Sequence, residues 1–287
     1  MKGKVVVISG ATSGIGEVAA QSLAAMGARI VLIARDAARG QKTLTRLRSL
    51  GSSAAHSIYY GDLSRISESK RVAAEISAAE PRLDVLINNA GALFGTRRLT
   101  ADSLEETFAT NHMAYFVLTL GLRASLIAGA PSRVVSTASA AHKGHTLDFD
   151  DLQATKGYSA IRAYGRSKLC NILFTRELAG RWKGTGVTAN CLHPGFVATR
   201  FGDSSGGVLS GVVRVGKALF AITPEKGAKT LVYLASSPEV AAISGDYFYK
   251  CRIATPTAAA QDDDAAKRLW EESARIAGIE TWKPESS

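Results

Sequence analysis

The sequence predicts an α/β fold in which one doubly wound parallel sheet of about seven strands lies between two layers of helices. Short apolar runs rich in β-branched residues alternate with helix-periodic segments along nearly the whole chain. Several predicted strands end directly at glycine, asparagine or proline, which punctuate loops. No repeat, linker or shift of composition divides the 287 residues, so we expect a single domain over residues 1–287.

The predicted strands span Lys4–Ser9, Arg29–Ala34, Ser57–Tyr60, Leu83–Ile87, Arg133–Ser136, Val187–Leu192 and Gly245–Tyr249. Helical spacing of apolar residues occurs between them, over Gly14–Met26, Gln41–Leu50, Glu68–Ala79, Leu104–Leu126, Ala163–Trp182 and Pro224–Leu234. Parallel neighbours need a long crossover, usually a helix, so this alternation predicts a parallel sheet covered on both faces. An amphipathic helix over Ala265–Ala277 is predicted within a C-terminal extension, residues 258–287.

Bulk properties exclude several classes of protein. The net charge is +10, but lysine and arginine are scattered rather than clustered, which does not favour a nucleic-acid partner. Cys170, Cys191 and Cys251 form no CxxC pair and are typical of reduced thiols. The sequence shows no signal-peptide pattern and no apolar run of about 18 residues, so we expect a cytoplasmic protein without a membrane span.

A glycine-rich turn follows the first predicted strand, with the spacing G-x-x-x-G-x-G. Such glycines let a backbone approach a pyrophosphate at a helix N-terminus, where free N–H groups favour anions. The spacing differs from the usual G-x-G-x-x-G, and alone it is equally compatible with a purely structural turn. Its place after the first strand of an alternating chain favours a dinucleotide and a Rossmann fold. The predicted contacts are Gly10, Thr12, Ser13, Gly14, Ile15 and Gly16.

The end of the second predicted strand should select between NAD and NADP. An acidic residue there would bind the ribose 2′-hydroxyl of NAD. The sequence instead has the small Ala34 followed by Arg35, whose guanidinium suits a 2′-phosphate. Asp36 would partly neutralise Arg35, and a solvated surface arginine is the alternative. We expect NADP(H), with NAD(H) as the less favoured cofactor.

Tyr164 and Lys168 lie four positions apart on a predicted helix, which places them on one face about a turn apart. A free tyrosine titrates near pH 10, so a phenolate at neutral pH requires a lower pKa. A neighbouring ammonium and an oxidised nicotinamide ring would together supply this shift. Such a tyrosine can exchange a proton with an alkoxide or alcohol, which is the acid–base half of carbonyl/alcohol redox chemistry.

Two other segments have competing interpretations. His142 and His145, with Asp148, Asp150 and Asp151 nearby, resemble a metal site, but solvated loop carboxylates are the better interpretation and we expect no metal. His193 is expected to be a structural turn residue.

Residues 200–223 are the candidate substrate lid. Within them, Val208–Ile222 is equally compatible with a mobile lid or a packed helix, and a patch that contacts lipid is a third possibility.

Taken in order, these motifs resemble those of the short-chain dehydrogenase/reductase family, classical type. The resemblance covers nearly the whole chain: the glycine turn, Asp62-Leu63, Asn88-Asn89-Ala90-Gly91, Asn111, Ser139, Tyr164 and Lys168, and Pro194-Gly195 with Thr199. Softer similarity, in the segment after Asn171, in His193-Pro194-Gly195 and in the tail after Lys267, is typical of the retinol-dehydrogenase-like branch. Membrane-bound members of that branch carry an N-terminal anchor; we expect none here, so the resemblance does not imply a membrane location or, with it, a retinoid substrate.

The resemblance implies a role for each matching residue. Tyr164 would be the proton donor and acceptor, Lys168 would lower its pKa and hold the nicotinamide ribose, and Ser139 would bind the substrate oxygen. Asn111 would position a water that connects Lys168 to solvent. The remaining cofactor contacts would be Asp62 and Leu63 at the adenine, Asn89, Ala90 and Gly91 at its ribose, and Pro194, Gly195, Val197 and Thr199 at the nicotinamide.

The predicted function is NADP(H)-dependent hydride transfer between nicotinamide and a small-molecule carbonyl or alcohol. Two alternatives remain: a reductase of carbon–carbon double bonds, as in the similar protochlorophyllide reductases, and a non-catalytic binding protein that senses NADP(H). The intact Tyr164/Lys168 pair disfavours the second, because such sensors commonly lose it. A homodimer through two long helices, as in many family members, is an open question because the C-terminal extension would cover one such surface.

Overall fold

The computed structural model describes residues 1–50, 55–195 and 222–280. Its strands form one sheet in the order β3-β2-β1-β4-β5-β6-β7-β8. The strands are β1 (Val5–Ser9), β2 (Arg29–Ala34), β3 (Ser57–Tyr60), β4 (Val85–Asn88), β5 (Ser132–Thr137), β6 (Val187–Leu192), β7 (Tyr247–Tyr249) and β8 (Arg252–Ile253). All pairs from β3 to β7 are parallel, which confirms the predicted Rossmann-type sheet.

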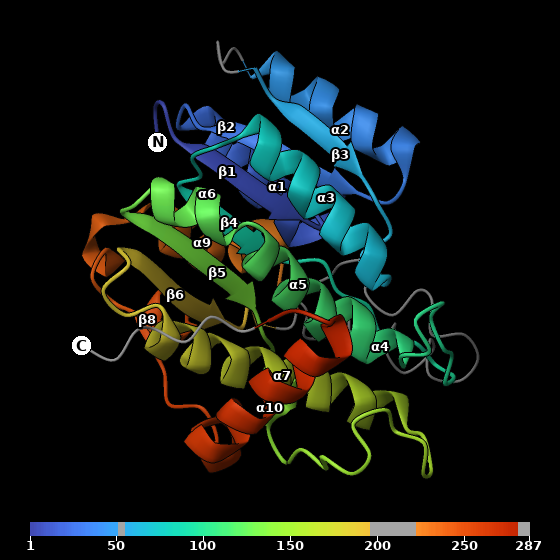
Figure 1. Ribbon diagram of the computed structural model, residues 1–287. Helices are drawn as coiled ribbons and strands as arrows, with labels where there is room; N and C mark the ends of the chain where they lie inside the picture. Colours follow the sequence, from blue (N-terminus) through green and yellow to red (C-terminus); the bar gives the residue numbers. More distant parts are fainter. Residues whose placement is uncertain (51–54, 196–221, 281–287) are drawn as a thin grey trace.

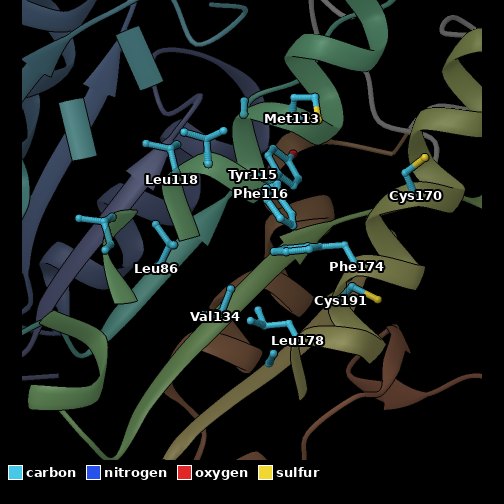
Figure 2. Close-up of a cluster of buried hydrophobic side chains, with 14 of the residues drawn as sticks. Leu86, Met113, Tyr115, Phe116, Leu118, Val134, Cys170, Phe174, Leu178 and Cys191 are labelled. Carbon is cyan, nitrogen blue, oxygen red and sulfur yellow. The ribbon is translucent and has the colours of Figure 1, made fainter. Parts of the chain in front are cut away.

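Helices cover both faces of the sheet (Figure 1). Helices α1 (Gly14–Ala25), α2 (Ala37–Ser49) and α9 (Pro224–Ser236) enclose one apolar core, which includes Leu23, Leu44 and Leu231. Helices α3 (Ile66–Ala79), α5 (Ala114–Gly121) and α7 (Ala160–Arg181) enclose the other. Figure 2 shows part of this second core, where Phe116 and Phe174 lie over Leu86 and Val134 of the sheet. The architecture therefore has three layers, as predicted.

The sheet has one strand more than predicted. Strand β8 pairs antiparallel with β7 through Phe248↔Ile253 and Tyr249↔Arg252. The turn between them holds Lys250 and Cys251 at φ values of 50° and 59°, a left-handed conformation that usually selects glycine or asparagine. Because neither residue is a turn former and the strand is only two residues long and exposed, the sequence pattern did not reveal it.

The long helix predicted over Leu104–Leu126 is interrupted in the structure. It consists of α4 (Glu106–Phe108), a π-helical segment η1 (Ala109–Met113), α5, and α6 (Arg123–Ala128) after a break at Leu122. A π-helical turn keeps the apolar periodicity almost unchanged, so sequence spacing cannot detect it. The segment contains Asn111, and interruptions of this kind are frequent at functional sites.

Several other boundaries shift by a few residues because capping side chains extend the helices. Asp36 accepts a hydrogen bond from Arg39 N, so α2 begins at Ala37 rather than Gln41. Ser159 accepts one from Arg162 N, so α7 begins at Ala160 rather than Ala163.

The C-terminal extension packs along α7. Helix α10 (Asp263–Ala277) places Trp270 against Phe174, with ring centroids 5.9 Å apart and an interplanar angle of 15°. Arg181 lies over the same indole at 4.8 Å, and Arg176 pairs with Asp263 at 2.7 Å. The extension therefore covers part of α7 (Figure 1). Within the described ranges, no helix is long and apolar enough to cross a bilayer.

Candidate active site

The order of the strands places a topological switch point at the carboxyl ends of β1 and β4, where open α/β sheets have a crevice. Strand β1 lies between β2 and β4, so the chain leaves β1 toward one edge and returns at β4 toward the other. Ligands of open α/β sheets bind outside the carboxyl ends of the strands at such a switch point. The glycine turn follows β1 and the Asn89–Gly91 turn follows β4, so the fold brings these two predicted motifs to the same place.

The glycine turn packs so closely that its end glycines have no space for a side chain. A Cβ at Gly10 would lie 2.6 Å from Ala90 Cα, and one at Gly16 would lie 2.3 Å from Gly10 O. Gly10 and Gly14 also have φ values of 68° and 59°. Ser13 stands at the N-cap of α1 without a side-chain capping bond, which leaves the N–H groups of the first turn available to an anion.

The turn after β4 is fixed by side chains from two neighbouring strands. Ser9 Oγ accepts from Asn89 N at 3.1 Å and from Ala90 N at 3.2 Å. Asn89 Nδ2 donates to Gly10 O at 3.0 Å, and its Oδ1 accepts from Thr137 Oγ1 at 3.3 Å. The Asn89 side chain is therefore occupied by the protein, and the backbone of Asn89–Gly91 forms the wall of the crevice.

The adenosine end of the predicted cofactor site lies at β2 and β3. Ala34 ends β2 and is 5% exposed, and the exposed Arg35 follows it. Asp36, which we expected to neutralise Arg35, instead caps α2 and pairs with Arg39 at 3.3 Å.

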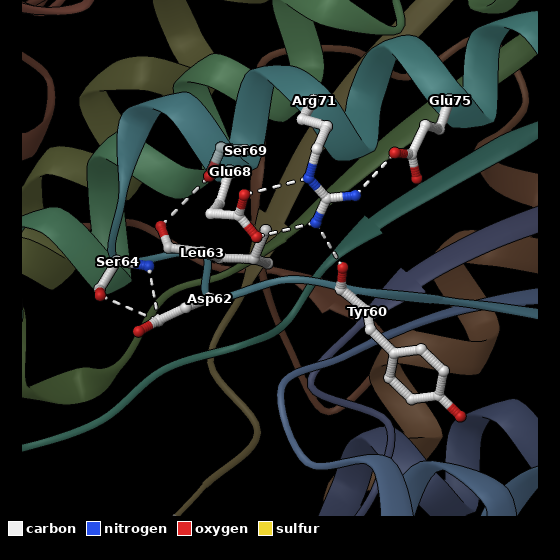
Figure 3. Close-up of polar contacts among 8 residues, drawn as sticks. All are labelled: Tyr60, Asp62, Leu63, Ser64, Glu68, Ser69, Arg71 and Glu75. Atoms are coloured by element: carbon white, nitrogen blue, oxygen red, sulfur yellow. Dashed lines mark hydrogen bonds and ion pairs between the residues drawn. The ribbon is translucent and has the colours of Figure 1, made fainter.

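After β3, Asp62 Oδ1 accepts from Ser64 N and Ser64 Oγ (Figure 3). These two bonds fix the Asp62 carboxylate in the turn, and Leu63 beside it is buried. Arg71 braces the same turn by donating to Tyr60 O at 2.7 Å. Arg35, Asp62 and Leu63 thus lie where the prediction needs them, at the carboxyl ends of neighbouring strands.

Tyr164 and Ser139 approach one another because Gly165 has no side chain. A Cβ at Gly165 would lie 2.6 Å from Ala141 O and 2.2 Å from Cδ2 of the His145 ring. Helix α7 therefore rests directly on the turn that carries Ser139. A side-chain hydrogen bond joins Tyr164 and Ser139. Ser139 Oγ also accepts from Ala141 N at 3.1 Å, so its hydroxyl hydrogen is donated to Tyr164 in the chain by itself and would be donated to a substrate oxygen in a complex.

Lys168 is buried beneath the tyrosine. Its Nζ donates to Thr137 O at 2.9 Å and lies 5.7 Å from the centroid of the Tyr164 ring and 5.6 Å from that of Tyr115. Burial lowers the pKa of Lys168 to about 7, because an ammonium is poorly solvated there. Its remaining N–H groups are the natural donors to a ligand in the crevice.

The pKa of Tyr164 differs from the prediction. Burial raises the pKa of Tyr164 to about 12, and the hydrogen bond with Ser139 only partly opposes this. The ammonium of Lys168 lies over the ring face and bonds Thr137 O rather than the phenol oxygen. In the chain by itself Tyr164 is therefore a protonated phenol, which suits a proton donor. The lower pKa expected from the sequence relied also on the charge of an oxidised nicotinamide ring.

Asn111 connects the two halves of the site through its side chain. Its Oδ1 accepts from Ala92 N at 2.8 Å, and its Nδ2 donates to Ala92 O and to Ser167 Oγ, both at 2.9 Å. A Cβ at Gly91 would lie 3.3 Å from Asn111 Oδ1 and 3.4 Å from Lys168 Nζ. The amide is thus fully used in joining the turn after β4 to α7, so a water at Asn111 would depend on its backbone carbonyl.

The predicted nicotinamide contacts are only partly described. Pro194 and Gly195 follow β6 at the same end of the sheet, with Gly195 at a φ of 90°. His193 accepts from Gly195 N at 3.2 Å through Nδ1, in line with the predicted structural role. Val197, Thr199 and nearly all of the predicted lid lie outside the described residues. Among the described residues no group of three or more metal-ligating side chains occurs.

Sequence reasoning missed several residues that build the site. Gly165 permits the contact between α7 and the Ser139 turn, and Ser167 bridges Asn111 and Tyr164 O. Arg166 fixes the loop that precedes α7 by donating to Asp148 O and Asp151 O. His142 was weighed only as a metal ligand, yet it bonds the backbone of Ser139. Gly165 alone had a signal in the sequence, as a glycine inside a helix between two catalytic candidates.

Comparisons with known proteins agree with this geometry. Residues 4–206 match the family described as short chain dehydrogenase. The chain is 39% identical to human Retinol dehydrogenase 14, over 97% of this chain and 88% of the relative, and 38% identical to human Retinol dehydrogenase 12, with the same coverage of both.

Solved structures share the fold. A protein of uncharacterised function from Mycobacterium paratuberculosis superposes with a TM-score of 0.78 at 29% identity, covering 97% of this chain and 95% of its own. A short chain dehydrogenase from Burkholderia cenocepacia in complex with NADP gives a TM-score of 0.68 at 25% identity, covering 86% and 96%. The chain belongs to the short-chain dehydrogenase family of oxidoreductases and is similar to the retinol dehydrogenases.

Proposed function

We propose that the protein catalyses hydride transfer between NADP(H) and a carbonyl or alcohol carbon, with Tyr164 as the general acid and base. The observation that carries the proposal is the convergence of Tyr164, Ser139 and Lys168 on the crevice at the switch point of the sheet. A tyrosine, a hydroxyl donor and an ammonium are the groups that such chemistry needs. The similarity to retinol dehydrogenases favours an apolar aldehyde or alcohol as substrate.

The residues of the crevice fit a dinucleotide. Gly10 and Gly16 form a backbone cradle that a Cβ would fill, and the uncapped first turn of α1 presents N–H donors to a phosphate. Lys168 would hold the ribose next to the nicotinamide, and Arg35 the 2′-phosphate. When bound there, NADPH would supply the hydride that reduces the carbonyl carbon.

The protein's own residues account for the proton. Ser139 donates its hydroxyl hydrogen to the carbonyl oxygen and stabilises the charge that develops there. Tyr164 transfers the phenolic proton to that oxygen, so the carbonyl gains one hydride at carbon and one proton at oxygen and becomes an alcohol. In the oxidation direction Tyr164 takes the proton back. Lys168, buried below the ring, stabilises the phenolate that is left.

The preference for NADP(H) depends on Arg35. A hydrogen bond to a charged group contributes about 1.5–3 kcal/mol, which corresponds to a preference of roughly tenfold to a hundredfold. Arg35→Asp should therefore move the ratio of kcat/KM for NADPH over NADH toward NADH by that factor. Arg39→Asp, at the other arginine of the same capped turn, is the control. An unchanged ratio in Arg35→Asp would remove this residue from cofactor selection.

The function is tested by following NADPH oxidation with a panel of aldehydes, ketones, quinones and activated alkenes that includes retinaldehyde, with product analysis. We expect alcohols from the aldehydes or ketones. Products saturated at a carbon–carbon bond would indicate the alkene reductase instead, and tight NADPH binding without turnover on any member would favour a cofactor-sensing protein.

A cytoplasmic location remains a proposal, supported by three unpaired cysteines.

A further inference from the structure

The turn that carries Ser139 is closed by a buried histidine. The 3-10 helix η2 (Ala140–His142) follows Ser139, whose carbonyl oxygen accepts from His142 N at 3.2 Å and from His142 Nδ1 at 2.7 Å. The hydroxyl oxygen of Ser139 accepts from Ala141 N at 3.1 Å. Both the backbone and the side chain of Ser139 are therefore fixed by this turn. The bond from the His142 ring to Ser139 O is the shortest of these three hydrogen bonds.

The other nitrogen of this ring faces the C-terminal part of the chain. His142 Nε2 accepts from the backbone N–H of Thr257 at 3.4 Å. An amide donor facing Nε2 requires a lone pair there, so the ring hydrogen must be on Nδ1, where it is donated to Ser139 O. The imidazole is fully buried, and burial lowers the pKa of His142, which favours this neutral form.

Aromatic packing holds the ring in this orientation. His142 meets Tyr247 of β7 edge to face, with centroids 5.3 Å apart and an interplanar angle of 71°. Tyr247 in turn stacks on His193 at 5.8 Å and 22°. His193 accepts from Gly195 N, so the three rings connect the turn after β5 to the turn after β6. A change at His142 would thus act on two walls of the crevice.

We propose that His142 is a positioning residue: its Nδ1–H tautomer fixes the backbone of Ser139 and ties this turn to the C-terminal segment at Thr257. His142 does not touch the reacting atoms, and it acts through Ser139. The part of the proposal that concerns turnover rests on the proposed function. The tautomer and its dependence on Thr257 do not.

The tautomer is tested first, by nitrogen-15 NMR of the wild-type protein with labelled histidine, assigned through His142→Asn. For the His142 ring at pH 7.5 we expect the shift of a protonated nitrogen at Nδ1 and the shift of an unprotonated nitrogen at Nε2. A ring with its hydrogen on Nε2, or a doubly protonated ring, would overturn the proposal whatever the enzyme does.

The positioning role is tested by a matched pair at position 142. His142→Asn keeps a donor near Ser139 O, whereas His142→Leu keeps the volume without a donor. Because a displacement of about 1 Å can reduce turnover a hundredfold, we expect His142→Leu to lower kcat about tenfold to a hundredfold while the KM for NADPH changes less than about twofold. His142→Asn should retain most of kcat. Equal kcat values in the two variants would contradict the role.

The connection to the C-terminal segment is tested at Thr257, which does not require a change in the ring. Thr257 has φ −65°, a value that proline adopts, so Thr257→Pro removes the N–H donor at a compatible φ, and Thr257→Val keeps the donor. We expect only the proline variant to shift the His142 nitrogen signals and to lower kcat by about threefold to tenfold. Identical spectra in the two variants would contradict the hydrogen bond between Thr257 N and His142 Nε2. If the wild type turns over no substrate, the proposed function fails, but these spectra still show whether the Thr257 N–H binds the His142 ring.

Discussion

The two halves of the active site are built by different means. The cofactor half is made of backbone turns in close contact, where Gly10 and Gly16 lie against Ala90 and Asn89. The catalytic half is held by side chains from distant parts of the chain: Thr137 O binds Lys168, and Thr257 N binds His142 beneath Ser139. The cofactor half is set mainly by close backbone contacts, and the catalytic half mainly by hydrogen bonds between residues far apart in the sequence, with a close contact at Gly165 as well. The two halves should therefore fail separately when they are perturbed.

The largest effect is expected from Gly165→Ala, which acts on the catalytic half. A Cβ there would lie 2.6 Å from the carbonyl oxygen of Ala141 and would push the Ser139 turn away from Tyr164. We expect kcat to fall about a hundredfold, with the dissociation constant of NADPH changed less than threefold. Steady-state kinetics and titration calorimetry measure the two quantities. Gly180→Ala is the matched control, because a Cβ at this glycine of the same helix meets nothing within 4 Å.

Gly16→Ala should give the opposite pattern. Its Cβ would lie 2.3 Å from Gly10 O and 2.4 Å from Asn89 Nδ2, so the phosphate turn must move. Overpacking of this kind costs about 1–3 kcal/mol, which corresponds to roughly tenfold to a hundredfold weaker NADPH binding. At saturating cofactor, kcat should remain within about threefold of the wild type. Equal losses of kcat and affinity in both variants would mean that the two halves are not separable.

A smaller effect is expected on the free energy of unfolding of the cofactor-free protein, through the charge of Lys168. Burial lowers its pKa to about 7, whereas the unfolded chain holds this proton up to about pH 10. Between these values the unfolded state binds more protons, so the free energy of unfolding contributed by Lys168 rises with pH. Relative to Lys168→Met, the wild type should gain about 2 kcal/mol between pH 7 and pH 9. Denaturant titrations at both pH values test this, and a difference that shrinks as pH rises would contradict the lowered pKa.

The sequence predicts the cofactor half of the site better than the catalytic half. Strands β2, β3 and β6 have the bounds expected from their apolar runs, and the cofactor turns lie where local spacing placed them. The π-helical segment at Asn111 and strand β8 were not predicted, because neither changes the local apolar period enough to be seen. The contact between His142 and Thr257 joins residues 115 positions apart, and only tertiary packing creates it.

The pKa of Tyr164 shows the same limit at the catalytic centre. The spacing of Tyr164 and Lys168 correctly placed both residues together, and the sequence analysis expected the ammonium, with an oxidised nicotinamide ring, to lower the pKa of the phenol. In the folded chain the ammonium bonds Thr137 O, and burial of the phenol has the larger effect on its pKa. Sequence reasoning identified the groups, and the structure determined which interaction dominates.

The central claim, that Tyr164 is the proton donor, is tested most directly by comparing Tyr164→Phe with Tyr115→Phe. Both rings lie within 6 Å of Lys168 Nζ, measured at their centroids, and Tyr115 is fully buried. NADPH oxidation with the best aldehyde of the panel should fall at least about a thousandfold in Tyr164→Phe, consistent with loss of general acid catalysis, and less than about tenfold in Tyr115→Phe. Affinity for NADPH should stay within about threefold of the wild type in both. Near-normal turnover in Tyr164→Phe would contradict the mechanism.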